Sequence, residues 1–185
     1  MAASSGAGNT HTRVFIDKQS PAVYAAQVEV AKAVRGAVSS AGFDRRFAEL
    51  INVRVSQINR CAYCLNLHTT AAVKAGETTQ RLAVLTAWRA APALFSEKER
   101  AALTLAESIT TLPDEETQDH QYRGARAVLT EDEVAAVSWL AIAMNSFNRI
   151  SIVSRHRVRA KYPAHNSTAH RVKRWAVPDL RTGRG

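Results

Sequence analysis

The sequence predicts an all-α protein in which about seven helices form one domain. Apolar residues recur at helical spacing through most of the 185 residues, and hydrophobic residues make up 46% of the chain. Residues that begin or end helices stand between these segments. The valines of NVRVSQI are the main hint of a strand, but their flanks favour a helix. Abundant alanine and only 6% aromatic residues suit closely packed helices.

Pairs of capping and breaking residues give the order of the helices. Ser20 supplies a cap and Pro21 a first-turn residue for the first helix, and Gly42 is its expected stop. The expected helices cover residues 22–41, 45–58, 61–75, 80–91, 100–112, about 115–128 and 134–155.

The second and third helices are separated by a short break. Asp44 is placed to cap the second helix. Asn59 and Arg60 interrupt the pattern, so the third helix is expected to begin near Cys61 and to end at Gly76, a residue suited to a helix C-terminus.

The remaining helices begin at recognisable caps. Thr78 or Thr79 is expected to cap a helix that ends before Pro92. Two capping boxes, in which a Ser or Thr is followed three residues later by Glu, open later helices. They are SEKE at 96–99 and TEDE at 130–133, and Pro113 ends the helix that follows the first box.

The ends of the chain differ in composition from its body. Residues 151–185 hold nine Lys or Arg and one acid, Asp179, so this segment carries +8 of the net charge of +9. We expect a mobile N-terminal segment over 1–19, a helical domain over 20–160 and a basic C-terminal tail over 161–185. The tail is interpreted as a solvated end, although a basic tail can also attract nucleic acid. It lacks a DNA-binding motif and aromatic residues beyond Trp175.

The sequence shows neither a membrane-spanning segment nor the pattern of a secretory signal. No run of eighteen apolar residues indicates a transmembrane helix, and MAASSGAGNTHTR lacks the order of a secretory signal. We therefore expect a cytoplasmic protein without a membrane partner. In a reducing compartment, a C-x-x-C pair is more often catalytic or metal-binding than structural.

The most specific motif is ELINVRVSQINRCAYCLNLH, residues 49–68. It contains the two cysteines of the chain, Cys61 and Cys64, with His68 four residues after the second and Glu49 twelve residues before the first. If Cys61 lies in the first turn of its helix, free N–H groups and the helix dipole favour its thiolate. His68 then follows Cys64 by one turn, so its ring can approach that sulfur. A helical hairpin would bring Glu49 towards His68 and orient the imidazole.

This set of groups predicts peroxide reduction. A thiolate attacks the O–O bond and becomes a sulfenic acid, which the second thiol converts to a disulfide with release of water. An external dithiol must then reduce the disulfide by exchange.

The motif resembles the core of the alkylhydroperoxidase D-like group of the carboxymuconolactone decarboxylase family. That group has a Glu, eleven residues, and then C-x-x-C-x-x-x-H, which Glu49, Cys61, Cys64 and His68 match position for position. The resemblance continues through QRLAVLTAWRAAPALFSEKERAALTLAESIT into AIAMNSFNRI and covers roughly residues 20–155.

The resemblance implies a helical bundle of the alkylhydroperoxidase D-like type, antioxidant peroxidase activity, and assembly into trimers or hexamers. It implies no bound cofactor, and reduction by an external dithiol of the lipoyl type or similar, carried by a partner protein. It assigns sulfenic acid formation to Cys64, the resolving role to Cys61, and the proton relay to Glu49 and His68. Well-studied members have a histidine where this chain has Tyr63, which cannot act as a base near pH 7. The decarboxylase branch lacks the cysteine pair.

Other interpretations of the cysteines remain open. Structural zinc sites usually need four ligands, and only Cys61, Cys64 and His68 are near in sequence. Two buried, inert thiols are another alternative. A third is a thiol–disulfide exchange or sensing protein without peroxidase activity, which Tyr63 motivates. The weakest alternatives are a lactone decarboxylase and a nucleic-acid-binding protein that uses the basic tail.

Polar residues elsewhere carry weaker signals. Asn145, Asn148 and Arg149 lie in an apolar helix and are expected to bond backbone groups or subunit interfaces. Trp88 and Trp139 occupy apolar helical positions and are expected in the core. No role is assigned to the histidines outside the motif, which are His11, His120, His156, His165 and His170.

Overall fold

The computed structural model describes residues 13–159, and every regular element in that range is helical. The all-α prediction is confirmed. The elements in order are α1 (Ile16–Gln19), α2 (Pro21–Ser40), α3 (Arg45–Ile58), α4 (Ala62–Lys74), α5 (Thr79–Val84), the 3₁₀ helices η1 (Leu85–Ala90) and η2 (Pro92–Leu94), α6 (Glu97–Thr111), α7 (Glu115–Arg126) and α8 (Glu131–Ser154).

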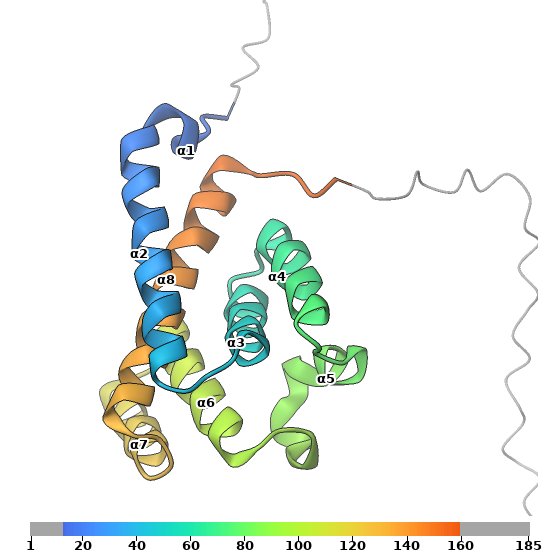
Figure 1. Ribbon diagram of the computed structural model, residues 1–185, viewed down its shortest axis with the longest axis vertical. Coiled ribbons are helices and arrows are strands. Elements are labelled where there is room, and N and C mark those ends of the chain that lie inside the picture. The colour runs from blue at the N-terminus through green and yellow to red at the C-terminus, as the bar shows by residue number, and fades with distance from the viewer. Residues whose placement is uncertain (1–12, 160–185) are drawn as a thin grey trace, which may run out of the picture.

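Helix α3 occupies the centre of the bundle (Figure 1). It packs against α4, α6 and α8, and α2 lies along α8. Its apolar residues Leu50, Ile51, Val53 and Val55 are almost fully buried. Because α3 has partners on several sides, polar side chains on this helix are also enclosed, and this is how Glu49 comes to be in the interior.

The expected caps are confirmed at most helix starts. Asp44 accepts a hydrogen bond from the backbone N–H of Phe47, and Thr78 accepts one from Arg81. The boxes at 96–99 and 130–133 both show the two reciprocal hydrogen bonds that define a capping box. Ser20 stands at the N-cap of α2, but its side chain makes no capping bond there.

The helix expected over 80–91 is wrong in its second half. The α-helix ends at Val84, and the chain continues as 3₁₀ turns with non-helical angles at Ala87. This break allows two consecutive side chains to reach one acid: Trp88 donates its Nε1–H to Glu107 at 2.8 Å, and Arg89 forms an ion pair with the same carboxylate. Tertiary pairing has overridden the local helical preference.

The two tryptophans lie in different surroundings. Trp88 is buried as expected, with 4% of its surface exposed. The expectation for Trp139 is wrong, because this side chain is 54% exposed on α8. Helical periodicity identifies apolar positions, but it does not say which apolar face of a long helix receives a partner.

The ends of the helical domain are described only in part. Helix α1 lies within the expected N-terminal segment 1–19 and packs against α2 and α8. Residues 1–12 lie outside the described range, as does the whole basic tail predicted over 161–185. No helix between residues 13 and 159 is both long and apolar enough to cross a membrane.

The buried carboxylate of Glu107 predicts loss of stability in acid. Burial works to raise its pKa, but bonds from Trp88, Arg89 and Arg54 prevail and hold the pKa below its usual value. Because the folded-state pKa is depressed, this stabilisation is fully present above an unfolded-state value near ~4.3 and is lost as the pH falls through the folded-state pKa.

Replacing Glu107 by Gln should therefore lower the free energy of unfolding at pH 7 by about 2 kcal/mol, since bonds to a charged partner are lost. Urea unfolding from pH 7 to pH 3 checks this, and the gap between wild type and variant should narrow as the pH falls. A gap that stays constant over this range would show that the charge of Glu107 contributes nothing.

Candidate functional site

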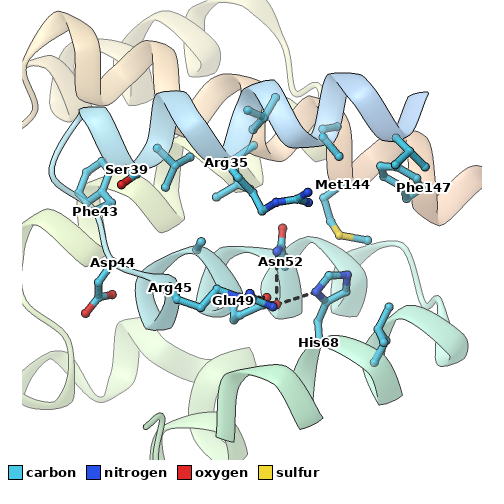
Figure 2. Close-up of a pocket in the computed structure, with 18 residues that line it drawn as sticks. Arg35, Ser39, Phe43, Asp44, Arg45, Glu49, Asn52, His68, Met144 and Phe147 are labelled. Carbon is cyan, nitrogen blue, oxygen red and sulfur yellow. Dashed lines mark hydrogen bonds and ion pairs between the residues drawn. The ribbon is translucent and has the colours of Figure 1, made fainter. Parts of the chain in front are cut away.

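Glu49 of α3 lies at the centre of a hydrogen-bonded group. Its Oε1 accepts from Arg45 Nε at 2.6 Å, and its Oε2 lies 2.6 Å from His68 Nδ1 and 3.4 Å from Asn52 Nδ2 (Figure 2). Arg45 and Asn52 come from neighbouring turns of α3, whereas His68 comes from α4. The expected hairpin thus brings Glu49 and His68 together.

The protonation of this pair follows from its contacts. Burial works to raise the pKa of Glu49, but the bonds and charges of His68 and Arg45 outweigh it and hold the pKa below its ordinary value. An ionised carboxylate accepts hydrogen bonds only, so His68 Nδ1 carries a proton towards it. The other ring nitrogen, Nε2, has no hydrogen-bond partner among residues 13–159 and is available to a ligand or water.

The cysteines stand at the start of α4. Cys61 is the N-cap residue and Cys64 lies in the first turn. Both are free thiols with 3% of their surface exposed, and the two sulfurs are 2.8 Å apart, with Cys61 donating to Cys64. Cys64 Sγ also lies 4.0 Å from the carbonyl oxygen of Phe147 on α8. The pair is therefore in direct contact and closed off from bulk water.

The expectation of a thiolate at Cys61 is wrong. Burial, followed by the hydrogen bond with Cys64, raises the pKa of the Cys61 thiol to about 11. Its backbone N–H already bonds Ser56 O at 3.1 Å. In an enclosed site, the cost of burying a charge exceeds the benefit of the helix N-terminus.

His68 does not bond either sulfur among the described residues, although its position one turn from Cys64 suggested an approach. The ring is held by Glu49 instead. Proton transfer between His68 and a cysteine therefore requires a water or a ligand between them.

A polar network fixes the turn before Cys61. Asn59 Nδ2 donates to Asn145 Oδ1 at 2.8 Å and to Asn148 Oδ1 at 2.9 Å, and Asn148 in turn donates to Ser56. Arg60 adopts a left-handed φ of 55° in this turn. The polar residues of α8 were expected to bond backbone groups or subunit interfaces. Asn145 and Arg149 each donate to a backbone carbonyl of α8, whereas Asn148 bonds side chains. The two asparagines hold the cysteine-bearing turn against α8.

A cluster of aromatic and acidic side chains around His156 was not predicted from the sequence. His156 Nε2 lies 3.1 Å from Asp17 Oδ1 of α1, and the His156 ring stacks on Phe15. Tyr63, between the two cysteines, meets the His156 ring edge-on at 5.1 Å between centroids. Because Asp17 and His156 are 139 positions apart, no local pattern could have linked them. They close α1 and the end of α8 over the start of α4.

A cavity of about 700 Å³ opens beside Glu49 and His68. Its walls come from α2, α3, α4 and α8 and from the turn that joins α2 to α3, and Figure 2 shows them around the Glu49 group. The lining residues are Val28, Ala31, Val34, Arg35, Val38, Ser39, Phe43, Asp44, Arg45, Ala48, Glu49, Asn52, Leu67, His68, Leu140, Ala143, Met144 and Phe147. A ligand in this cavity meets the open side of His68.

The alternative of a zinc site is not supported by any set of metal ligands in the described part of the chain. No group of three or more His, Cys, Asp or Glu residues between 13 and 159 is arranged to hold a metal ion. His68, the third candidate ligand of a zinc site, is bonded to Glu49 instead.

The high pKa of Cys61 can be measured directly. In a Cys64→Ser variant the remaining thiol should ionise well above the ordinary value near ~8.5, because burial persists without its partner. Thiolate absorbance at 240 nm against pH reports this ionisation. A midpoint at or below pH 8.5 would show that the helix N-terminus dominates.

Comparisons with known proteins agree with the helical fold. The model of the carboxymuconolactone decarboxylase family matches residues 21–108. The uncharacterized protein YdfG of Bacillus subtilis (strain 168) is 40% identical over 118 residues, which cover 64% of this chain and 80% of that protein. A crystal structure from Agrobacterium tumefaciens superposes with a TM-score of 0.72 at 28% identity, covering 81% of this chain and 99% of the other. That protein is described as one of unknown function and as a candidate antioxidant defence protein AhpD.

Proposed function

Because the chain belongs to the carboxymuconolactone decarboxylase family, we propose that it is a thiol-dependent peroxidase of the alkylhydroperoxidase D-like type. It would reduce hydrogen peroxide or organic hydroperoxides in antioxidant defence. The observation that carries this proposal is the contact between the two free thiols, 2.8 Å apart. The Glu49–His68 pair lines a cavity that the cysteines do not line, although Cys64 Sγ lies 4.0 Å from the carbonyl oxygen of Phe147, a residue of its wall. The description of the Agrobacterium protein supports it.

The first step is attack of the Cys64 thiolate on the terminal peroxide oxygen. The S–O bond forms as the O–O bond breaks, so sulfur is oxidised to a sulfenic acid and the peroxide is reduced to an alcohol or water. The departing oxygen needs a proton. The Cys64 proton passes through a bridging water to His68 Nε2 and from there to the departing oxygen, while Glu49 stabilises the cationic ring through Nδ1.

Formation of the disulfide is the second step. The Cys61 sulfur attacks the sulfenic sulfur of Cys64, an S–S bond forms, and the hydroxyl leaves as water with the Cys61 proton. The raised pKa keeps that proton on Cys61 until this stage. An external dithiol of the lipoyl type then takes the disulfide through exchange, becoming a disulfide itself and restoring both thiols.

The proposal extends to partners and location. We expect a dithiol-carrying reductant protein, a cytoplasmic location and a homo-oligomer, either a trimer or a hexamer. Exposed apolar side chains on α8, including Trp139 and Ile142, support the assembly, because such surfaces are commonly buried between subunits.

Peroxide consumption in the presence of a dithiol tests the function. The reduced protein should consume peroxide in proportion to the dithiol supplied, and dihydrolipoamide is a suitable reductant. Oxidised protein should contain one Cys61–Cys64 disulfide, which mass spectrometry detects. The absence of turnover with both peroxide classes would refute the proposal.

Two observations favour a second candidate function. His68 lacks a direct bond to either sulfur, and Tyr63 stands where well-studied members have a histidine. Without an adjacent base, the pair would serve as a thiol–disulfide exchange or sensing module. Rapid exchange with a dithiol, combined with negligible peroxide turnover, would select this function over the first.

A further inference from the structure

We propose that the cavity beside His68 binds an amphiphilic carboxylate, whose apolar body lies between α2 and α8 and whose anionic group is held by Arg35. This inference rests on the proposed function in one respect: if the protein is a peroxidase, the reactive ligand is the hydroperoxide of such an acid. The binding site itself is argued from the walls of the cavity.

The apolar part of the wall is extensive. Helix α2 contributes Val28, Ala31 and Val34, and α8 contributes Leu140 and Met144. A volume of about 700 Å³ is within the usual range for small-molecule sites and far larger than a hydrogen peroxide molecule requires. The walls therefore suit a ligand with a long hydrocarbon body.

Among residues 13–159, the charged part of the wall has one cation without a carboxylate partner, the exposed Arg35. Both carboxylates are engaged, since Glu49 accepts from Arg45 and His68 while Asp44 caps α3 through Phe47. Arg45 is likewise held by Glu49. Arg35, in contrast, has no carboxylate within ion-pair distance among residues 13–159.

Arg35 is directed into the space that His68 faces. In Figure 2 its side chain extends from α2 towards α3, and Arg35 lines the same cavity as Asn52, Met144 and His68. A guanidinium binds a carboxylate through two parallel hydrogen bonds, which gives both strength and orientation. An anionic group on an apolar ligand thus complements this wall, whereas a neutral ligand provides no charged partner for the Arg35 guanidinium.

Direct binding of decanoate and 1-decanol to the reduced protein tests the site without any peroxide chemistry. Calorimetry at low ionic strength should show decanoate binding about tenfold more tightly than 1-decanol, as expected for one charge-assisted pair. Arg35→Gln should abolish that difference by weakening decanoate alone, and Arg35→Lys should restore part of it.

Two further variants separate the charge from the cavity. Ala31→Phe fills the apolar wall and should weaken both ligands. Lys32→Gln removes an equal charge from an exposed position of α2 outside the cavity and should weaken neither. Equal affinity for the two ligands, no effect of Arg35→Gln, or an equal effect of Lys32→Gln would overturn the proposal.

A kinetic comparison distinguishes this inference from the proposed function. For the hydroperoxide of a fatty acid and for that of its methyl ester, the wild type should show a lower KM for the acid, and Arg35→Gln should remove this preference. Turnover without preference for the acid would overturn the inference and leave the peroxidase function standing. Arg35-dependent binding of decanoate without turnover of any peroxide would support the site and refute the peroxidase.

Discussion

Replacing Cys64 by Ser is expected to lower dithiol-dependent peroxide turnover by at least about 10³-fold, because a neutral alcohol cannot replace a thiolate as the nucleophile. The substitution replaces one buried sulfur atom by oxygen, and few other contacts depend on that atom, so the helical fold should persist. The measurement is kcat/KM for peroxide at saturating dithiol, with circular dichroism as the check on folding.

The matched variant is Cys61→Ser, which leaves the proposed nucleophile in place. It should react with one equivalent of peroxide and then stop, because no neighbouring thiol closes the disulfide. A sulfenic acid should accumulate on Cys64 and be trapped by dimedone. Trapping on Cys61 in the Cys64→Ser protein, with activity retained, would reverse the assigned roles.

Replacing Glu49 by Gln is expected to lower kcat/KM by about 10²-fold, since the carboxylate that stabilises the charged His68 ring is lost while the shape of the side chain is kept. In the wild type, the depressed pKa of Glu49 keeps the carboxylate ionised as the pH falls towards ~4. The acid limb of the pH–rate profile should therefore belong to other groups in the wild type.

The control for Glu49→Gln is Glu99→Gln. Glu99 is also a buried carboxylate bonded to an arginine, Arg81, but it does not line the cavity. This variant should lose stability to urea while its kcat/KM stays near that of the wild type. If the two variants lose activity equally, the effect of Glu49 is one of general stability and not of proton transfer.

The order of helices could be read from the sequence because local groups fix helix ends. Asp44, Thr78 and the two capping boxes satisfy backbone N–H groups within three residues of themselves, so their effect does not depend on the rest of the fold. The 3₁₀ turns after Val84 could not be predicted, because they depend on the contact of Trp88 with Glu107, which lies 19 residues further along the chain.

The same division applies to the candidate site. Spacing along two consecutive helices predicted that Glu49 would meet His68 and that Cys61 would meet Cys64, since a hairpin leaves few alternatives. Spacing did not predict that Cys61 would be too enclosed to ionise near neutral pH, because burial depends on α8 packing over α4. The contact of His156 with Asp17 and Tyr63 depends in the same way on the two ends of the domain meeting.

By itself, the amino-acid sequence determined the helical class, the helix boundaries set by caps, and the pairing of Cys61 with Cys64 and of Glu49 with His68, because these depend on groups in the same helix or in two consecutive helices. Only the tertiary structure decided that burial raises the pKa of Cys61, and that His68 bonds Glu49 instead of a sulfur. It also decided that Arg35 lines a cavity with no carboxylate within ion-pair distance among residues 13–159. Those properties are set by burial and by charges from distant helices, and neither is encoded in spacing along the chain.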